Sequence, residues 1–454
     1  METAIRENKM GTMGIPKLLY SVSIPIIISM LVQAMYNIVD SIYVAKFDSI
    51  NGTAALTIAF PIQNLMIAVA VGLAVGMNAL LSRSLGQKRF DKANVIAGQG
   101  FFLIFCGYLM FLILGLFLVK PFVALQADKG TLSYQYGVDY LSIVCIFSLG
   151  VFVQVIVERL LQSTGKSLFS MLTQLSGAIV NIVLDPIFIF TLDMGVRGAA
   201  IATVLGQFVA AFIGLALNFA VNKEIKIKIA NFVPNAKLVK DMLIIGIPSV
   251  LMQAIGSIMT FCMNIILISF SDIALNVFGV YFKLQSFVFM PIFGLNNGMV
   301  PIIAYNFGAR KKNRVFATIK LSAVTAVGYM MLGFLIFQIF PEALLGMFDA
   351  TPDMLAVGKV ALRVISLSFI FAGFSIIASV TCQALGKSIY SLFISVGRQL
   401  VVLIPAAFLL SLAGKVEFVW WAFPIAEIMS LALGTIFLIH VIKQSFPKNG
   451  DYVS

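Results

Sequence analysis

Long apolar runs alternate with short polar breaks along the whole chain, and this pattern predicts membrane-spanning helices. A helix that crosses about 30 Å of hydrocarbon needs about 20 apolar residues. Read against the Gly, Pro and charged breaks, the apolar runs predict twelve helices, near residues 17–44, 53–81, 93–120, 132–160, 167–191, 196–220, 239–270, 275–305, 315–341, 354–382, 388–412 and 418–442. We therefore expect an all-α integral membrane protein that crosses the lipid bilayer about twelve times.

Composition supports this expectation and excludes several classes of protein. The chain has 454 residues, of which 60% are hydrophobic and 11% are charged, whereas charged residues make up roughly a quarter of a soluble domain. It has one histidine, His440, and four cysteines without metal-ligand spacing. There is no Walker loop and no pairing of a nucleophile with a base. We expect neither an enzyme nor an ATP-driven pump, with no cofactor and no structural metal.

The distribution of positive charge predicts the orientation of the chain. Lys and Arg number 31 and the net charge is +12, which in a membrane protein first indicates basic cytoplasmic loops rather than a nucleic-acid partner. Most of them fall on the side of the N-terminus. Those on the other side are Lys46, Lys120, Lys129, Arg197, Lys359 and Lys415. Both termini are therefore predicted to be cytoplasmic.

The sequence repeats itself at an offset of about 222 residues. Gly72-Leu-Ala-Val-Gly-Met matches Gly294-Leu-Asn-Asn-Gly-Met, and Gln162-Ser-Thr-Gly-Lys-Ser matches Gln383-Ala-Leu-Gly-Lys-Ser. Each half then holds six helices, so the halves are related by a pseudo-two-fold axis along the membrane normal. We predict an N-lobe over 1–221, a cytoplasmic linker over 222–238 and a C-lobe over 239–454. Two such bundles suit alternating access across a central cleft.

An acidic residue lies inside the predicted helix 167–191. Asp185 follows Asn181 by four residues, so both share one helical face. Pro186 cannot donate its backbone nitrogen and is expected to kink the helix, which frees a carbonyl. A carboxylate, an amide oxygen and a carbonyl form a hard-oxygen site that suits H+ or Na+. The alternative is a buried pair whose hydrogen bonds are satisfied.

Asp40 is the second acid at membrane depth, in the predicted helix 17–44. Gln33, Tyr36 and Asn37 precede it at helical spacing and form a polar stripe with it. Alternatively, Asp40 lies near the outer end of the helix and is solvated. Pro25 in the same helix predicts a kink, which acts either as a pivot or as a static bend.

Two other polar residues of the first half have ordinary structural interpretations when taken alone. Thr203 lies in a helix rich in small residues, where a hydroxyl usually bonds back to its own helix. Tyr140 is typical of an aromatic residue at the membrane interface.

The second half does not repeat the acids. Met263 stands opposite Asp40, and Ile404-Pro-Ala-Ala stands opposite Asp185. The second half carries Lys283, Arg398 and Glu427 within its helices instead. Charges of both signs at membrane depth usually pair, so these residues are either a structural ion-pair network or polar contacts to a substrate. The cation site is predicted in the first half only.

Several motifs together resemble one known family. They are SIPIIISMLVQAMYNIVDSIYV, GLAVGMNALLSRSLGQ, QSTGKS, NIVLDP and WWAFPIAEI, distributed over nearly the whole chain. This combination resembles the multidrug and toxic compound extrusion (MATE) family. The Asp-bearing first helix and FMPIFGLNNGMVPIIAYNFGA look most like its DNA-damage-inducible, prokaryotic branch.

The resemblance implies a monomeric antiporter in the plasma membrane of a prokaryote. It would export organic cations and other amphipathic drugs in exchange for H+ or Na+. By resemblance, the cation site falls on Asp40, Asn181, Asp185 and Thr203, with Tyr36 and Tyr140 around it. Neutralising the acids would let the first helix bend at Pro25 and expel the drug. A flippase for lipid-linked or polysaccharide substrates shares the two-bundle plan and is the alternative function.

Overall fold

The computed structural model describes residues 8–226, 229–348 and 350–447, which form helices and turns with no β-strand among them. Eleven of the helices are long and apolar enough to cross a membrane, or twelve if one bent pair counts as a single span. The predicted all-α membrane fold is therefore confirmed. Part of the predicted linker and both chain termini lie outside the described residues.

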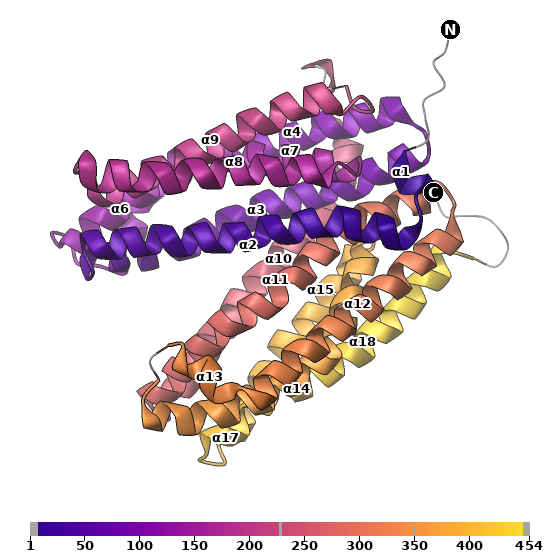
Figure 1. Ribbon diagram of the computed structural model, residues 1–454. Coiled ribbons are helices and arrows are strands. Elements are labelled where there is room, and N and C mark those ends of the chain that lie inside the picture. The colour runs from indigo at the N-terminus through magenta and orange to yellow at the C-terminus, as the bar shows by residue number, and fades with distance from the viewer. Residues whose placement is uncertain (1–7, 227–228, 349, 448–454) are drawn as a thin grey trace, which may run out of the picture. The chain divides into compact units, whose positions relative to one another are not determined.

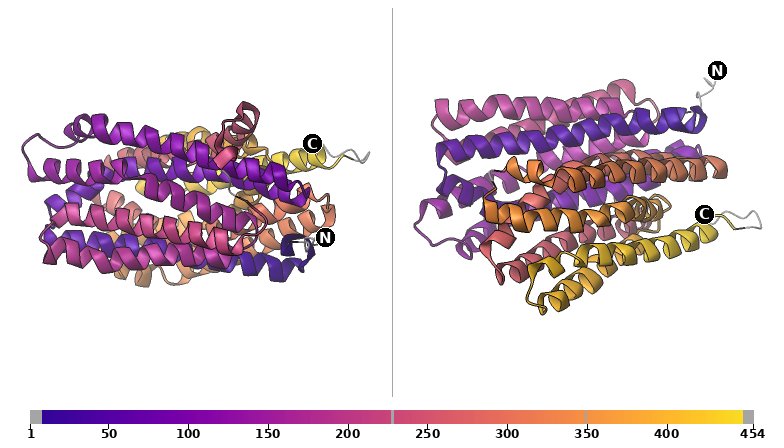
Figure 2. Two further views of the ribbon diagram at one scale, coloured as in Figure 1. Left: turned by 90° about the horizontal axis from the view of Figure 1, so that it is seen from above. Right: turned by 60° about the horizontal axis from the view of Figure 1, so that its bottom comes forward.

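The first half contains six spans after a short helix α1 (Lys9–Thr12). Figures 1 and 2 show them as long, roughly parallel rods. They are α2 (Ile15–Phe47), α3 (Asn51–Gly86), α4 (Phe90–Ile113) continued by η1 (Leu114–Leu118) and α5 (Val119–Ala124), the pair α6 (Leu132–Ile146) and α7 (Leu149–Ser163), α8 (Ser167–Pro186) continued by η2 (Ile187–Thr191), and α9 (Gly195–Val221). The α6–α7 pair, which corresponds to the single predicted span 132–160, is bent by 46° between its two helices.

The second half again contains six spans, preceded by a short 3-10 helix, η3 (Ile229–Phe232). They are α10 (Ala236–Ile268), α11 (Asp272–Gly308), α12 (Lys312–Ile339), α14 (Pro352–Ala384), α15 (Ser388–Val396) continued by η4 (Gly397–Leu403) and α16 (Ile404–Ser411), and α17 (Val416–Val419) followed by α18 (Ala422–Ser445). A short helix, α13 (Pro341–Gly346), connects α12 to α14. The predicted boundaries agree with these to within a few residues.

The internal repeat is visible in the backbone. Gly165 and Gly386, the fourth residues of the matching motifs that begin at Gln162 and Gln383, have φ angles of 78° and 79°. Lys88 and Arg310, also at matching positions, have φ angles of 59° and 58°. A positive φ is uncommon for a residue other than glycine, so its recurrence at the same place in each half shows that both halves use the same turns.

Internal contacts divide the chain into two compact units whose boundaries fall inside helices. One unit holds Ser21–Val250 together with α1, and the other holds Met13–Tyr20 with Leu251–Ser454. The first part of α10 belongs to the first unit because glycines let it approach α3 closely. A Cβ atom on Gly76 would lie 2.3 Å from the carbonyl oxygen of Met242. The predicted lobes follow the sequence repeat, whereas these units follow the packing.

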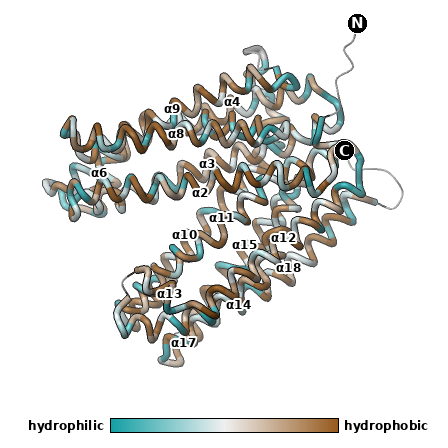
Figure 3. The backbone as a smooth tube through the Cα atoms, viewed as in Figure 1, coloured by the Kyte–Doolittle hydropathy of each residue, from teal (hydrophilic) through white to brown (hydrophobic). Residues whose placement is uncertain are grey.

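Large apolar side chains cover the outer faces of the helices. Phe212 in α9 is 73% exposed, Phe117 in η1 is 71% exposed and Phe60 in α3 is 64% exposed. Figure 3 shows apolar segments along the middle of the helices, with hydrophilic segments mainly at their ends and in the turns. Such exposure is costly in water but suits contact with lipid tails. The chain is a multi-pass membrane protein.

Polar side chains organise the turns between spans. The carboxylate of Asp48, between α2 and α3, accepts hydrogen bonds from the side chain of Asn51 at 2.9 Å and from its backbone nitrogen at 2.8 Å. These bonds stabilise the charged form and hold the pKa of Asp48 below its ordinary value. Ser271 and Thr351 similarly cap the first turns of α11 and α14.

Helices α8 and α9 are in close contact because each contributes a glycine to the interface. A Cβ atom on Gly206 would lie 2.7 Å from the carbonyl oxygen of Gly177 and 3.2 Å from the Cβ atom of Asn181. A Cβ atom on Gly177 would lie 2.8 Å from the carbonyl oxygen of Gly206. Small residues at helix contacts are the usual means of close approach in membranes. This contact brings Asn181 on α8 close to α9.

We expect Gly206→Ala to lower the stability of the protein by about 1–3 kcal/mol, because the added methyl group must push α8 away from α9. The measurement is the thermal unfolding midpoint of the purified protein in detergent. Gly279→Ala is the control, since Gly279 in α11 has open space where a Cβ atom would lie and alanine favours a helix. Equal midpoints for the two variants would contradict the proposed role of this contact.

Candidate cation site in the first half

Asp185 and Asn181 lie one turn apart at the end of α8, and Thr203 faces them from α9. The Asn181 amide nitrogen, Nδ2, donates to Asp185 Oδ1 at 3.2 Å and to Thr203 Oγ1 at 3.4 Å. Asp185 is fully buried and Asn181 is 2% exposed. The close approach of α8 and α9 places these three polar groups together inside the first unit.

Asp40 comes to the same place from α2. It is 8% exposed, so it is not the solvated residue of the alternative interpretation. Its charge acts on Asp185 across the gap between the helices. We call Asp40, Asn181, Asp185 and Thr203 the acid site. All four belong to the first unit.

The acid site contains oxygen atoms that receive no hydrogen bond. Asp40 Oδ1, Asn181 Oδ1 and Asp185 Oδ2 are all buried without a partner. An unsatisfied buried acceptor costs about 1–3 kcal/mol, and such groups are rare in folded proteins. Gln207 Oε1, one turn beyond Thr203 on α9, is also buried and unpaired. Three or four oxygen atoms without donors suit a small cation or a proton.

A network of neutral polar side chains surrounds the acid site. Tyr140 in α6 is 2% exposed, and its hydroxyl accepts a hydrogen bond from Gln63 Nε2 in α3 at 3.1 Å. Gln33, three residues before Tyr36 on α2, accepts a bond from Gln174 Nε2 in α8 at 2.8 Å. Tyr140 is therefore a buried member of this network rather than an interface aromatic.

Other predicted residues lie differently. Asn37 is exposed, and its backbone carbonyl accepts a bond from Ser41 Oγ at 2.8 Å. Pro25 lies inside α2, which continues without a break. At Pro186 the α-helix ends and the span continues as the π-helical turn η2. A change of helix type at a proline is one way to accommodate the missing backbone donor.

Sequence reasoning missed Gln63, Gln174, Gln207 and, above all, Glu158. Glu158 in α7 is 9% exposed and accepts a hydrogen bond from Gln154 Nε2 at 3.0 Å. Its position inside the predicted span 132–160 is the signal that could have identified it, because an acid within a span is a candidate functional residue.

In the second unit, Arg398 and Glu427 form an ion pair. Arg398 Nη1 on η4 donates to Glu427 Oε2 on α18 at 3.2 Å. Glu427 is 5% exposed, and its other carboxylate oxygen has no partner. Lys283 is not part of this pair: its Nζ lies 5.7 Å from the centroid of the Phe348 ring. Opposite charges at membrane depth are expected to pair. Of the three predicted residues, Arg398 and Glu427 pair and Lys283 does not join them.

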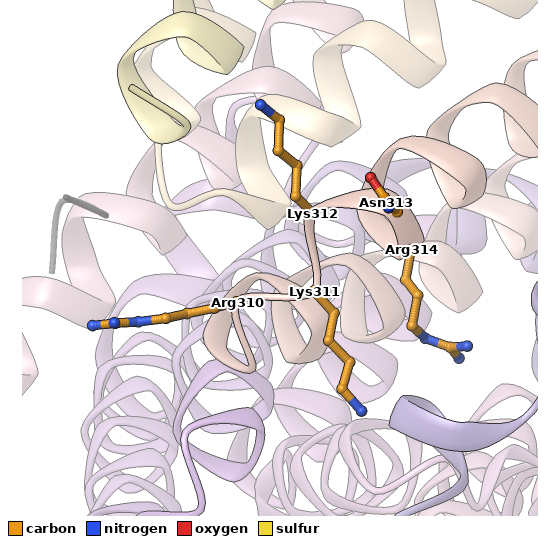
Figure 4. A pocket seen from close by; sticks show the side chains of 5 residues that line it. All are labelled: Arg310, Lys311, Lys312, Asn313 and Arg314. Atoms are coloured by element: carbon orange, nitrogen blue, oxygen red, sulfur yellow. The ribbon is translucent and has the colours of Figure 1, made fainter. Parts of the chain in front are cut away.

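A hollow of about 380 Å³ lies at the turn between α11 and α12, lined by Arg310, Lys311, Lys312, Asn313 and Arg314. Figure 4 shows the Arg310 and Lys312 side chains pointing in different directions from those of Lys311 and Arg314. The basic character of this turn repels cations and agrees with the predicted cytoplasmic loop. Its four basic side chains make it an unfavourable place for a cation.

Comparison with known proteins agrees with the repeat and with the fold. The family model MatE matches residues 25–187 and again residues 248–409. The chain belongs to the MatE family. This is a family of transporters rather than enzymes. Each match covers most of one half, and the first includes Asp40, Asn181 and Asp185 but ends before Thr203.

Relatives of similar length are multidrug exporters. Multidrug export protein MepA of Staphylococcus haemolyticus (strain JCSC1435) is 26% identical over 426 residues, which cover 93% of this chain and 92% of that protein. MepA of Staphylococcus aureus (strain MSSA476) is also 26% identical, with the same coverage. The MATE multidrug transporter DinF-BH, solved in complex with R6G, is 34% identical with a TM-score of 0.86, covering 96% of this chain and 98% of that one.

We expect Asp185→Asn to raise the thermal unfolding midpoint of the purified protein in buffer without added Na+. The amide removes a buried charge whose Oδ2 has no partner, and it can donate to Asn181 Oδ1. A gain of about 1–3 kcal/mol is expected from these effects. Asp193→Asn, at an exposed turn position, is the control. An unchanged or lower midpoint for Asp185→Asn would show that Asp185 is well satisfied by its surroundings.

Proposed function

We propose that the protein is a secondary antiporter that exports organic cations and similar amphipathic drugs in exchange for H+ or Na+. The observation that carries this proposal is the acid site. It has two buried acids and three acceptor oxygens without donors in a membrane-embedded bundle. Such a site is unfavourable when empty and charged, and it becomes favourable when a cation or proton neutralises it.

The chemistry of the proposed site suits both coupling ions. Carboxylate, amide and hydroxyl oxygens are hard ligands for a small cation, and each carboxylate can also bind a proton. Asp40 and Asp185 repel each other when both are charged, so binding of one positive charge is favoured. Asn181 and Thr203 supply neutral oxygens, and Asn181 holds Asp185 in place.

Coupling follows from the difference between the empty and the loaded site. Loading removes the repulsion between α2 and α8, and Pro25 and Pro186 are the proposed hinges through which these helices respond. The change in helix position then exchanges the ion for the drug.

The family and its multidrug-exporting relatives favour this function over the flippase alternative. We further propose a monomer in a prokaryotic plasma membrane, with both termini in the cytoplasm.

The test is efflux of ethidium from proteoliposomes that contain the purified protein, under an imposed Na+ gradient or an imposed pH gradient, one at a time. We expect one gradient to drive efflux and Asp185→Asn to abolish the driven efflux, because the amide removes the carboxylate charge that binds the proton or cation. Asp193→Asn should transport at the rate of the unmodified protein. Full activity of Asp185→Asn at normal expression would refute the site, and no driven efflux under either gradient would refute the antiport.

A further inference from the structure

Glu158 is a buried carboxylate that the acid site does not use. It lies in α7, and its own helix provides one partner, Gln154 Nε2 at 3.0 Å. The neighbouring Arg159 instead donates to Gln162 Oε1 at 2.9 Å. Glu158 therefore lacks a close ion pair among the described contacts, which is an expensive arrangement for an acid inside a membrane bundle.

The register between α7 and α8 gives the depth of Glu158. Gln162 Nε2 on α7 donates to Ser170 Oγ on α8 at 3.0 Å. The two helices are neighbours and run antiparallel. Glu158 lies one turn before Gln162 on α7, and Gln174 lies one turn after Ser170 on α8, so Glu158 and Gln174 are at the same level. Gln174 lies eleven residues before Asp185, or about 16 Å along the helix axis.

Gln174 connects this level to the acid site. It donates to Gln33 Oε1 at 2.8 Å, and Gln33 precedes Tyr36 by three residues and Asp40 by seven, so all three lie on one face of α2. Asp40, Glu158 and Asp185 all act electrostatically on the hydroxyl of Tyr36. Because Tyr36 stands between Gln33 and Asp40 on α2, polar groups continue from the level of Gln174 to the acid site.

Few charged side chains of the first unit lie on the helices around Glu158. The charge of Arg159, the next residue of α7, acts on Glu158, and the charge of Glu158 acts on Tyr36 of α2. The charged residues of the four helices packed against α7 lie mostly near helix ends. They are Arg83 at the end of α3, Asp91 and Lys92 at the start of α4, Asp185 at the end of α8, and Arg197 at the start of α9. Of these residues, Asp185 is an acid whose charge acts on Tyr36, as the charge of Glu158 does.

From this arrangement we infer that Glu158 is a third ion-binding carboxylate of the first half, beside Asp40 and Asp185, which receives the coupling ion from the acid site and releases it toward the end where α7 joins α8. The charge distribution predicts that this end is cytoplasmic. The ion passes Tyr36, Gln33 and Gln174, whose oxygens replace part of its hydration. If the ion is a proton, a carboxyl O–H bond in the acid site breaks and one forms on Glu158.

This inference rests on the proposed antiport, and its test separates the two. The ethidium efflux of Glu158→Gln in proteoliposomes is measured against the concentration of the driving ion, and the affinity for ethidium is measured at equilibrium by fluorescence. We expect the ion-driven rate to fall by about tenfold, as for loss of a supporting ligand, with unchanged ethidium affinity. Glu158→Asp should restore most of the rate because the carboxylate remains.

Asp128→Asn, which neutralises an exposed acid between α5 and α6, is the matched control and should behave as the unmodified protein. Gln174→Leu keeps Glu158 but removes the amide that joins it to Gln33, and it should slow efflux in the same way. A normal driven rate in Glu158→Gln would overturn the inference, and so would an equal loss of ethidium affinity. Absence of driven efflux in the unmodified protein would instead refute the antiport itself.

Discussion

A bilayer core offers no water to satisfy polar groups, and this constraint governs the whole molecule. Backbone groups meet it by forming helices, and most buried side chains meet it with a partner on the same or an adjacent helix. Thr318, Thr381 and Ser29, for example, donate back to a carbonyl one turn earlier. Buried acceptor oxygens without donors occur at several places, such as Gln285 and Asn296 in α11, but three of them, on Asp40, Asn181 and Asp185, belong to the acid site. Such unsatisfied groups are costly for folding and are expected where a ligand supplies the missing interaction.

Close helix packing makes the acid site possible. Gly177 and Gly206 allow α8 and α9 to approach until their backbones nearly touch, which brings Asn181 within reach of Thr203. The same device joins α3 to the first part of α10 through Gly72, Gly76 and Gly246. Small residues thus do two things in the first unit: they hold the bundle together and they set the spacing of Asn181 and Thr203 in the acid site.

The two halves share a backbone plan but differ in charge. The repeated turns have almost identical φ angles at Gly165 and Gly386 and at Lys88 and Arg310. The first half places acids without cationic partners near each other, whereas the second half pairs Arg398 with Glu427. An ion pair is already neutral and has little need of a coupling cation. The asymmetry therefore agrees with a cation site in one half, on a scaffold present twice.

Much of this protein could be predicted from its sequence. Apolar runs of about 20 residues can be stable only as membrane helices, so the spans were predicted to within a few residues, and the repeat at an offset of about 222 predicted two similar halves. Asp40 and Asp185 were identifiable because an acid within an apolar run is conspicuous.

The sequence could not show that Asn37 is exposed while Tyr140 is buried, because helical spacing gives only the face of a residue and not what covers it. Nor could it show that Glu158 lies level with Gln174, since that depends on the register between two helices. Only the packing of α2, α7, α8 and α9 decided which polar groups meet, because contacts between helices are set by side-chain fit over the whole bundle.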